Sequence, residues 1–437
     1  MSDDIQYQTG FGNHLRSEAV PGALPPRQNF PREAPFGLIA EQLNGTGFTL
    51  ERYRNLRTLL YRLRPAIHDR GFALMQAPPP AFVTCFDEGV SLPQVQRYTP
   101  IDIPEEPVDW LDGVQTFAGA GDPSIKRGMA VHLYAASADM KRVFTNIDGD
   151  LLLAPERGRL RVQTELGWLE AGPGELLILP RGIRFRIELP DGSARGVAAE
   201  LYDGHFQLPE RGLVGSNGLA DERHFRAPVA AYEDVVEDTT IVVKQGGRFW
   251  QTTAPNSPFD VVAWHGTYAP FVYDLDDFMS LGSVSHDHPD PSILTVLTSP
   301  MDDHGRNAID VGVFRGRWDP TEKTFRPPYF HRNSAIEFNA VIKAPSDTGP
   351  YRPGVFSYTP YLTPHGVSTR TQHSELERED DSPFRIPEQS LWLQFESTYV
   401  LKVLPRWLDG DSRDEGFMDN FKDWKPSSLV RDAWSPE

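Results

Sequence analysis

Proline and glycine occur along the whole chain, and they limit the length of any helix that it can form. The 437 residues include 39 prolines and 36 glycines. Both residues interrupt helices, and proline also lacks a backbone donor, so long helices have little room. The sequence therefore predicts a mainly β protein with few short helices, built from short strands in a jelly-roll or sandwich arrangement.

Several segments alternate polar and apolar residues, as strands with one buried face do. This pattern runs through residues 159–164 and 183–188, and it returns at 391–395 and 399–403. Each of these segments is predicted to be a strand. Residues 50–63 instead carry apolar side chains at intervals typical of a helix, so a helix is predicted there.

The middle of the chain resembles half of a cupin barrel. Between residues 148 and 190, two predicted strands are followed by Pro173 and Gly174 and then by an apolar run that ends at a Pro-Arg-Gly turn. In a cupin, a histidine shortly after such a turn binds a metal, whereas Phe185 stands at that position here. We therefore expect a barrel around residues 110–205 that lacks its own metal site.

Charge and composition exclude several classes of partner. The net charge is -18 and the sequence pI is about 5.1, which argues against nucleic acid or an anionic membrane surface, because phosphates need a basic footprint. The start of the chain lacks a secretory signal, and no apolar run approaches the roughly 20 residues that cross a bilayer, so a cytoplasmic location is expected. The single cysteine, Cys85, can form neither an internal disulfide nor a thiolate cage. Any metal must be bound by nitrogen and oxygen.

Two histidines and one glutamate form a candidate metal site. His331 follows an Arg-Pro-Pro-Tyr-Phe string, Glu337 comes six residues later, and His365 stands in a Thr-Pro-His-Gly string. Two imidazoles and one carboxylate are the ligand set of a non-haem Fe(II) site with positions open for oxygen and substrate. If the backbone from His331 to Glu337 is extended, their even separation places both side chains on one face of a sheet.

Other interpretations fit the same residues. Glu337 could be a surface carboxylate, and the two histidines could be hydrogen-bonded packing residues. The same ligands could bind zinc or manganese in an isomerase or hydrolase. A cupin-like shell could also be a binding protein without turnover.

Long strings in the correct order resemble the homogentisate 1,2-dioxygenase family. The matching strings span residue 7 to about residue 400, and they include residues 7–13, 18–25, 37–46, 260–266 and 287–292. The resemblance implies an Fe(II)-dependent enzyme that uses O2 to open the ring of homogentisate and forms maleylacetoacetate. It also implies a homo-oligomer, a hexamer made from two trimers.

The resemblance further implies two domains and specific site residues. An N-terminal β domain, residues 1–275, would contain the metal-free barrel, and a cupin-like domain, residues 276–437, would carry the iron. The family's iron ligands fall on the two histidines and the glutamate named above. Its active-site base falls on His288, and His286 is the nearest rival for that role.

Two residues next to His331 are candidates for binding the substrate. An anionic substrate needs local positive charge, and Arg332 is the best placed arginine because it follows ligand His331. Asn333 could orient the substrate or fix the turn. The family usually has a tyrosine about nine residues after the glutamate ligand, where it contacts the acetate arm, but residues 338–346 contain no tyrosine. Losing such a donor should change selectivity more than the reaction type, so gentisate or a substituted hydroquinone is an alternative substrate.

Overall fold

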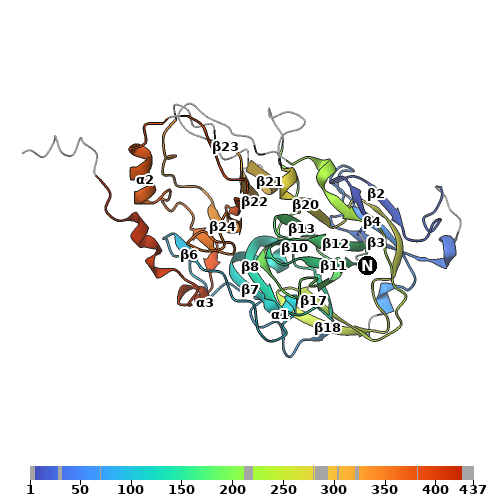
Figure 1. The fold of residues 1–437 in the computed structure, drawn as a ribbon. Helices are drawn as coiled ribbons and strands as arrows, with labels where there is room; N and C mark the ends of the chain where they lie inside the picture. Colours follow the sequence, from blue (N-terminus) through green and yellow to red (C-terminus); the bar gives the residue numbers. More distant parts are fainter. Residues whose placement is uncertain are drawn as a thin grey trace, which may run out of the picture.

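The computed structural model describes residues 5–27, 32–68, 70–210, 220–278, 280, 294–302, 305–319, 324–380 and 382–425. Within these ranges the protein is mainly β, as predicted, and its few helices are short (Figure 1). None of the described helices is long and apolar enough to span a membrane.

Two large sheets form the N-terminal half. The nine-stranded sheet has the order β1 (Tyr7–Thr9), β16 (Arg226–Pro228), β20 (Phe271–Asp274), β13 (Glu175–Leu179), β10 (Asp150–Arg157), β15 (Ala194–Leu201), β8 (Arg127–Ala136), β7 (Val114–Asp122) and β28 (Lys402–Val403). The seven-stranded sheet has the order β12 (Gly167–Ala171), β11 (Leu160–Thr164), β14 (Arg184–Glu188), β9 (Val143–Asn146), β17 (Thr239–Gln245), β18 (Arg248–Ala254) and β5 (Ala73–Leu74). Leu153 and Leu177 of the first sheet share one core with Val162 and Ile187 of the second. The predicted barrel segment thus divides its strands between two packed sheets.

Three smaller sheets complete the β structure. The four-stranded sheet has the order β2 (Leu15–Glu18), β19 (Val261–Gly266), β4 (Arg57–Arg62) and β3 (Ile39–Asn44). The six-stranded sheet has the order β21 (Thr295–Asp302), β22 (Arg306–Arg315), β27 (Leu391–Ser397), β24 (Ile336–Lys343), β25 (Phe356–Thr359) and β6 (Gln96–Tyr98), and a pair is formed by β23 (Trp318–Asp319) and β26 (Phe384–Arg385). The helix predicted at 50–63 is wrong, because much of that segment forms strand β4.

The helices are few and mostly a single turn. The α-helices are α1 (Trp110–Gly113), α2 (Thr369–Leu376) and α3 (Pro405–Leu408). The 3-10 helices are η1 (Pro35–Gly37), η2 (Ala66–His68), η3 (Pro123–Ile125), η5 (Glu222–His224), η6 (Leu275–Asp277) and η8 (Glu415–Phe421). The strands predicted at 159–164, 183–188 and 391–395 are confirmed as β11, β14 and β27, while only the end of 399–403 is a strand.

The two halves of the chain exchange strands. Strand β6, from the N-terminal half, pairs with β25 at the edge of the six-stranded sheet, and β28, from the C-terminal half, pairs with β7. Figure 1 shows β6 next to β24 of that sheet. The ring of Phe117 on β7 packs against Phe338 on β24 and Phe356 on β25, with centroids 5.6 and 5.3 Å apart. One face of the six-stranded sheet is therefore buried against the N-terminal half. The domain division at residue 275 stays a prediction.

Candidate metal centre

Strand β24 places Glu337 on the face of the six-stranded sheet that points away from the core. Side chains alternate between the faces of a strand, and Phe338, Ala340 and Ile342 lie in the main hydrophobic core. Glu337 and Asn339 therefore point the other way. Glu337 is nevertheless only 6% exposed, because the loops that carry the two histidines cover it.

His331 and His365 are brought together by backbone pairing between two loops. The amide of each residue donates to the carbonyl of the other, both at 3.1 Å, and their rings lie 4.1 Å apart between centroids. The backbone from His331 to Glu337 does not meet the condition of an extended strand, because it bends at residues 334 and 335 before β24 begins at Ile336. The convergence comes from the loop and not from even spacing on one strand.

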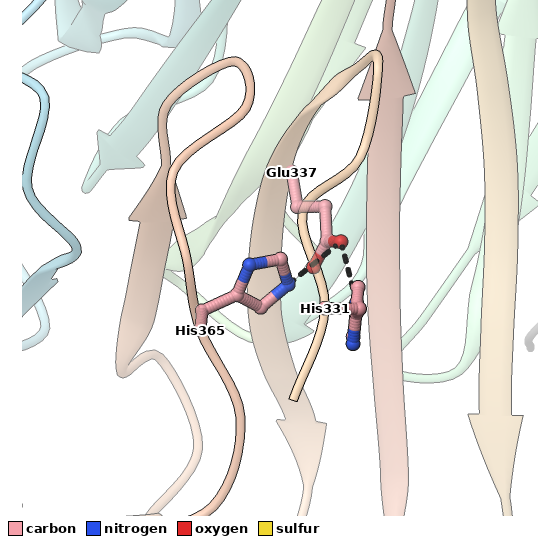
Figure 2. A group of neighbouring side chains, drawn as sticks. All are labelled: His331, Glu337 and His365. Atoms are coloured by element: carbon pink, nitrogen blue, oxygen red, sulfur yellow. Dashed lines mark hydrogen bonds and ion pairs between the residues drawn. The ribbon is translucent and has the colours of Figure 1, made fainter. Parts of the chain in front are cut away.

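The three predicted ligands converge on one point (Figure 2). Glu337 Oε1 lies 3.0 Å from His365 Nε2 and 3.5 Å from His331 Nε2. Ligand atoms of all three residues lie within 4.8 Å of one another. Because bonds from a metal to nitrogen or oxygen are about 2 Å long, this spacing and donor set fit a single divalent cation.

Neighbouring groups orient these ligands. His365 Nδ1 donates to the carbonyl oxygen of Thr363 at 2.9 Å, which directs Nε2 toward the carboxylate. Asn333 Nδ2 donates to Glu337 Oε1 at 2.6 Å. Such outer hydrogen bonds fix the orientation of metal ligands in proteins. Asn333, which the sequence suggested for substrate binding, is therefore hydrogen-bonded to the predicted ligand Glu337 in the structure.

The electrostatics favour a charged carboxylate at the centre. Burial raises the pKa of Glu337, but hydrogen bonds from His331 and His365 outweigh it and hold that pKa well below its usual range. Burial lowers the pKa of His365, while the hydrogen bond to Glu337 raises it, and the net effect is a raised pKa. The glutamate is therefore ionised across the physiological range and available as an anionic ligand.

A second carboxylate lies beside this group, and the sequence analysis missed it. Glu396 on β27 stands directly opposite Glu337 in the strand register. Its pKa is raised to about 7, first by burial and then by the negative charges of Glu337 and Asp310. The alternation predicted for 391–395 could have revealed it, since continuing that period puts position 396 on the same face as Gln394.

The other predicted residues lie elsewhere. Arg332 is exposed, and among the described residues no hydrogen bond or ion pair joins it to the ligands. His288 and its rival His286 lie outside the described residues. Phe185, at the position of a cupin ligand, is 1% exposed and packs edge-on against Trp110 and Phe144.

A cavity of about 350 Å³ opens beside Glu337 and His365. Its floor is the outward face of strands β24, β25 and β6, and its walls come from the start of α2 and from η8. The lining is mostly apolar and includes Tyr351, Trp392 and Phe421. Such a site next to a candidate metal group suits a small aromatic molecule.

A two-histidine, one-carboxylate group with such a cavity beside it defines the class of non-haem metal-dependent oxygenases. Family models narrow this class. The model described as homogentisate 1,2-dioxygenase N-terminal matches residues 6–275, and the model described as homogentisate 1,2-dioxygenase C-terminal matches residues 276–428. The chain belongs to the homogentisate 1,2-dioxygenase family.

A curated relative agrees with this membership. The homogentisate 1,2-dioxygenase of Oryza sativa subsp. japonica is 43% identical over 431 residues, which cover 96% of this chain and 90% of the relative. Among solved structures, Ylba from E. coli is 7% identical with a TM-score of 0.31 and covers 73% of this chain and 95% of its own. AerE from Microcystis aeruginosa is also 7% identical, with a TM-score of 0.29, and covers 69% and 98%. Structural similarity this low does not bear on the substrate.

Proposed function

We propose that this protein is an iron-dependent homogentisate 1,2-dioxygenase. It consumes one O2 for each homogentisate and opens the ring between the hydroxyl-bearing and acetate-bearing carbons, which gives maleylacetoacetate. The observation that carries this proposal is the convergence of His331, Glu337 and His365 within 4.8 Å, in a chain that matches both family models.

The same three residues would hold Fe(II). Their donor set of two imidazoles and one carboxylate suits non-haem iron and leaves further positions for substrate and oxygen. When bound, the metal supplies oxygen activation and lowers the pKa of a coordinated hydroxyl. Glu337 contributes the negative charge, and Asn333 and Thr363 keep the ligands in place through the hydrogen bonds described above.

We propose His288 as the general base of the reaction. A phenolic hydroxyl with a pKa of about 10 gives its proton to an imidazole with a pKa of about 6.5 at a cost of roughly 4.8 kcal/mol. A histidine alone is therefore a poor base for this substrate. His288 would accept the proton only from a hydroxyl that the site has already made acidic, and it would return the proton later.

The remaining predictions concern binding and assembly. We propose that Arg332, exposed next to His331, attracts the anionic substrate toward the site, since charge near a cleft raises the encounter rate. Asn333 would contact substrate in addition to the glutamate ligand. We also propose a homo-oligomer, a trimer or a hexamer, as the resemblance implies.

Oxygen uptake tests the function directly. The protein is loaded with Fe(II) under anaerobic conditions and then mixed with homogentisate in an oxygen electrode. We expect one O2 to be consumed per homogentisate, and we expect His365→Ala to lose this uptake. His14→Ala removes an exposed histidine directly before β2 and should leave the uptake unchanged. Absence of uptake by the iron-loaded protein would overturn the proposal.

The missing family tyrosine supports a second candidate substrate. Residues 338–346 lack that donor, so gentisate and substituted hydroquinones belong in the same assay. A larger kcat/KM for one of these than for homogentisate would keep the ring-cleaving chemistry and change the substrate.

A further inference from the structure

One guanidinium from the N-terminal half enters the cavity beside the metal ligands. Arg97 lies on β6, the strand that pairs with β25 at the edge of the six-stranded sheet. In the register, Arg97 stands opposite Ser357, and Ser357 stands opposite Asn339. These three residues form one row across three strands, and all three line the cavity.

The spacing of this row suits a small aromatic acid. Glu337 lies two residues before Asn339, so it is two strands and two residues away from Arg97. Neighbouring strands are about 4.8 Å apart and residues rise about 3.3 Å each, which separates the two Cα atoms by about 12 Å. Both side chains line the same cavity, so one small molecule bound in it can reach both.

The surroundings hold the guanidinium in place. Nε and Nη2 of Arg97 both donate to Asp414 Oδ2, at 2.9 and 2.5 Å. The guanidinium also lies over the rings of Phe417 and Tyr351, 4.6 and 5.9 Å from their centroids. Nη1 makes no hydrogen bond to the described residues. The arginine is therefore pre-positioned, and the two N–H groups of Nη1 remain for a ligand.

No other lysine or arginine is among the described residues that line this cavity. The rest of the lining is largely apolar and includes Val341, Val355 and Trp392. A carboxylate that leaves water for such a cavity requires a charged partner. Arg97 supplies that partner, and Tyr351 adds a hydroxyl-bearing ring beside it.

We propose that Arg97 binds the carboxylate of the substrate's side arm and selects para-dihydroxyphenyl acids over uncharged hydroquinones. This inference rests on the proposed function, because it assumes that the ring hydroxyl faces the metal ligands. Residues 338–346 lack the tyrosine that contacts the acetate arm in the family. The inference assigns that recognition role to Arg97 on β6. Asp414 orients the guanidinium and offsets part of its charge.

The test compares homogentisate with methylhydroquinone, which has the same ring hydroxyls and no carboxylate. In the iron-loaded enzyme, we expect Arg97→Met to raise KM for homogentisate by about tenfold to a hundredfold, the range for a lost charged hydrogen bond. KM for methylhydroquinone and kcat for both substrates should stay within about twofold. Arg70→Met removes an exposed arginine paired with Asp238 and is the matched control.

A second variant serves if Arg97→Met does not fold. Asp414→Asn keeps an oxygen that can accept from Arg97 and removes the competing negative charge, so KM for homogentisate should fall while KM for methylhydroquinone stays unchanged. The inference is overturned if Arg97→Met affects both substrates equally or neither, or if Arg332→Met alone gives the carboxylate-dependent change. A rise or no change in KM for homogentisate in Asp414→Asn also overturns it.

Anaerobic calorimetry separates this inference from the proposed function. If the wild-type enzyme takes up no oxygen with any substrate, the proposed function fails. Binding of homogentisate and methylhydroquinone to the iron-loaded protein still tests Arg97. Weaker binding of the acid alone in Arg97→Met supports the inference, and equal binding by variant and wild type overturns it.

Discussion

At the scale of single residues, we expect the charge of Glu337 to decide whether a metal is retained. Glu337→Gln keeps the size of the side chain and removes the anionic donor, so we expect little bound iron after loading and dialysis. Metal analysis by mass spectrometry measures iron per chain, with Glu51→Gln, an exposed glutamate, as the control. Full retention of iron in Glu337→Gln would remove Glu337 from the ligand set.

A change at Asn333 distinguishes a role in metal binding from a role in substrate binding. It donates to Glu337 Oε1 at 2.6 Å, and loss of such an outer partner weakens metal binding by about 10- to 100-fold. We expect Asn333→Ala to show that loss in a competitive chelator titration, whereas Asn44→Ala, on an exposed strand position, should not. An unchanged metal affinity together with a raised KM would instead support the substrate-binding role.

The sequence identified the two histidines and the glutamate that converge, but not their full set of neighbours. His331, Glu337 and His365 lie within 35 residues and share a recognisable donor set, so local patterns and family strings were enough. Glu396 and Arg97 reach the same face through strand pairing. The sequence around Glu396 or Arg97 does not indicate which strands will lie in the same sheet as β24.

At the scale of the element, strand β24 has one face for chemistry and one for stability. Phe338 is fully buried next to Glu337 in the chain, and truncating a buried phenylalanine to alanine typically costs about 3–5 kcal/mol. We expect that loss for Phe338→Ala in urea unfolding of the metal-free protein. Phe325→Ala removes a ring that is 58% exposed and should change stability by about 0.5 kcal/mol or less. Equal effects of the two changes would contradict this division.

The incorrect prediction of a helix at residues 50–63 has a physical explanation at the scale of the element. Strand β4 lies between β3 and β19, and its last three residues, Leu60, Tyr61 and Arg62, are all buried. A strand covered on both faces loses the alternation that identifies strands in a sequence. The confirmed strand β14 has one buried and one partly buried face and keeps its alternating pattern.

At the scale of the whole molecule, buried carboxylates make the fold sensitive to acid. Glu200 is fully buried, and burial alone would raise its pKa, but Lys244 and His132 lower it to about 2. Asp150 behaves in the same way, because His205 and Arg181 outweigh burial and lower its pKa to about 2. Glu200 pairs with Lys244 on a strand of the other large sheet, and Asp150 pairs with Arg181 and His205 in loops. The ionisation of both carboxylates therefore supports the packing of the N-terminal half.

The direction of the pH dependence follows from these shifts. A carboxylate whose pKa is lower in the folded state than in the unfolded state stabilises the fold above the unfolded pKa, near 4 to 4.5 here. That stabilisation is lost as the pH falls toward about 2. We expect the contribution of these two carboxylates to the free energy of unfolding, measured in urea between pH 7 and pH 3, to be level down to about pH 5 and then to decrease. Glu200→Gln should lower stability at pH 7 and flatten the decrease, because the neutral side chain leaves Lys244 with Asp148 as its remaining anionic partner. An identical pH profile in Glu200→Gln and the wild type would show that this buried ion group does not control acid unfolding.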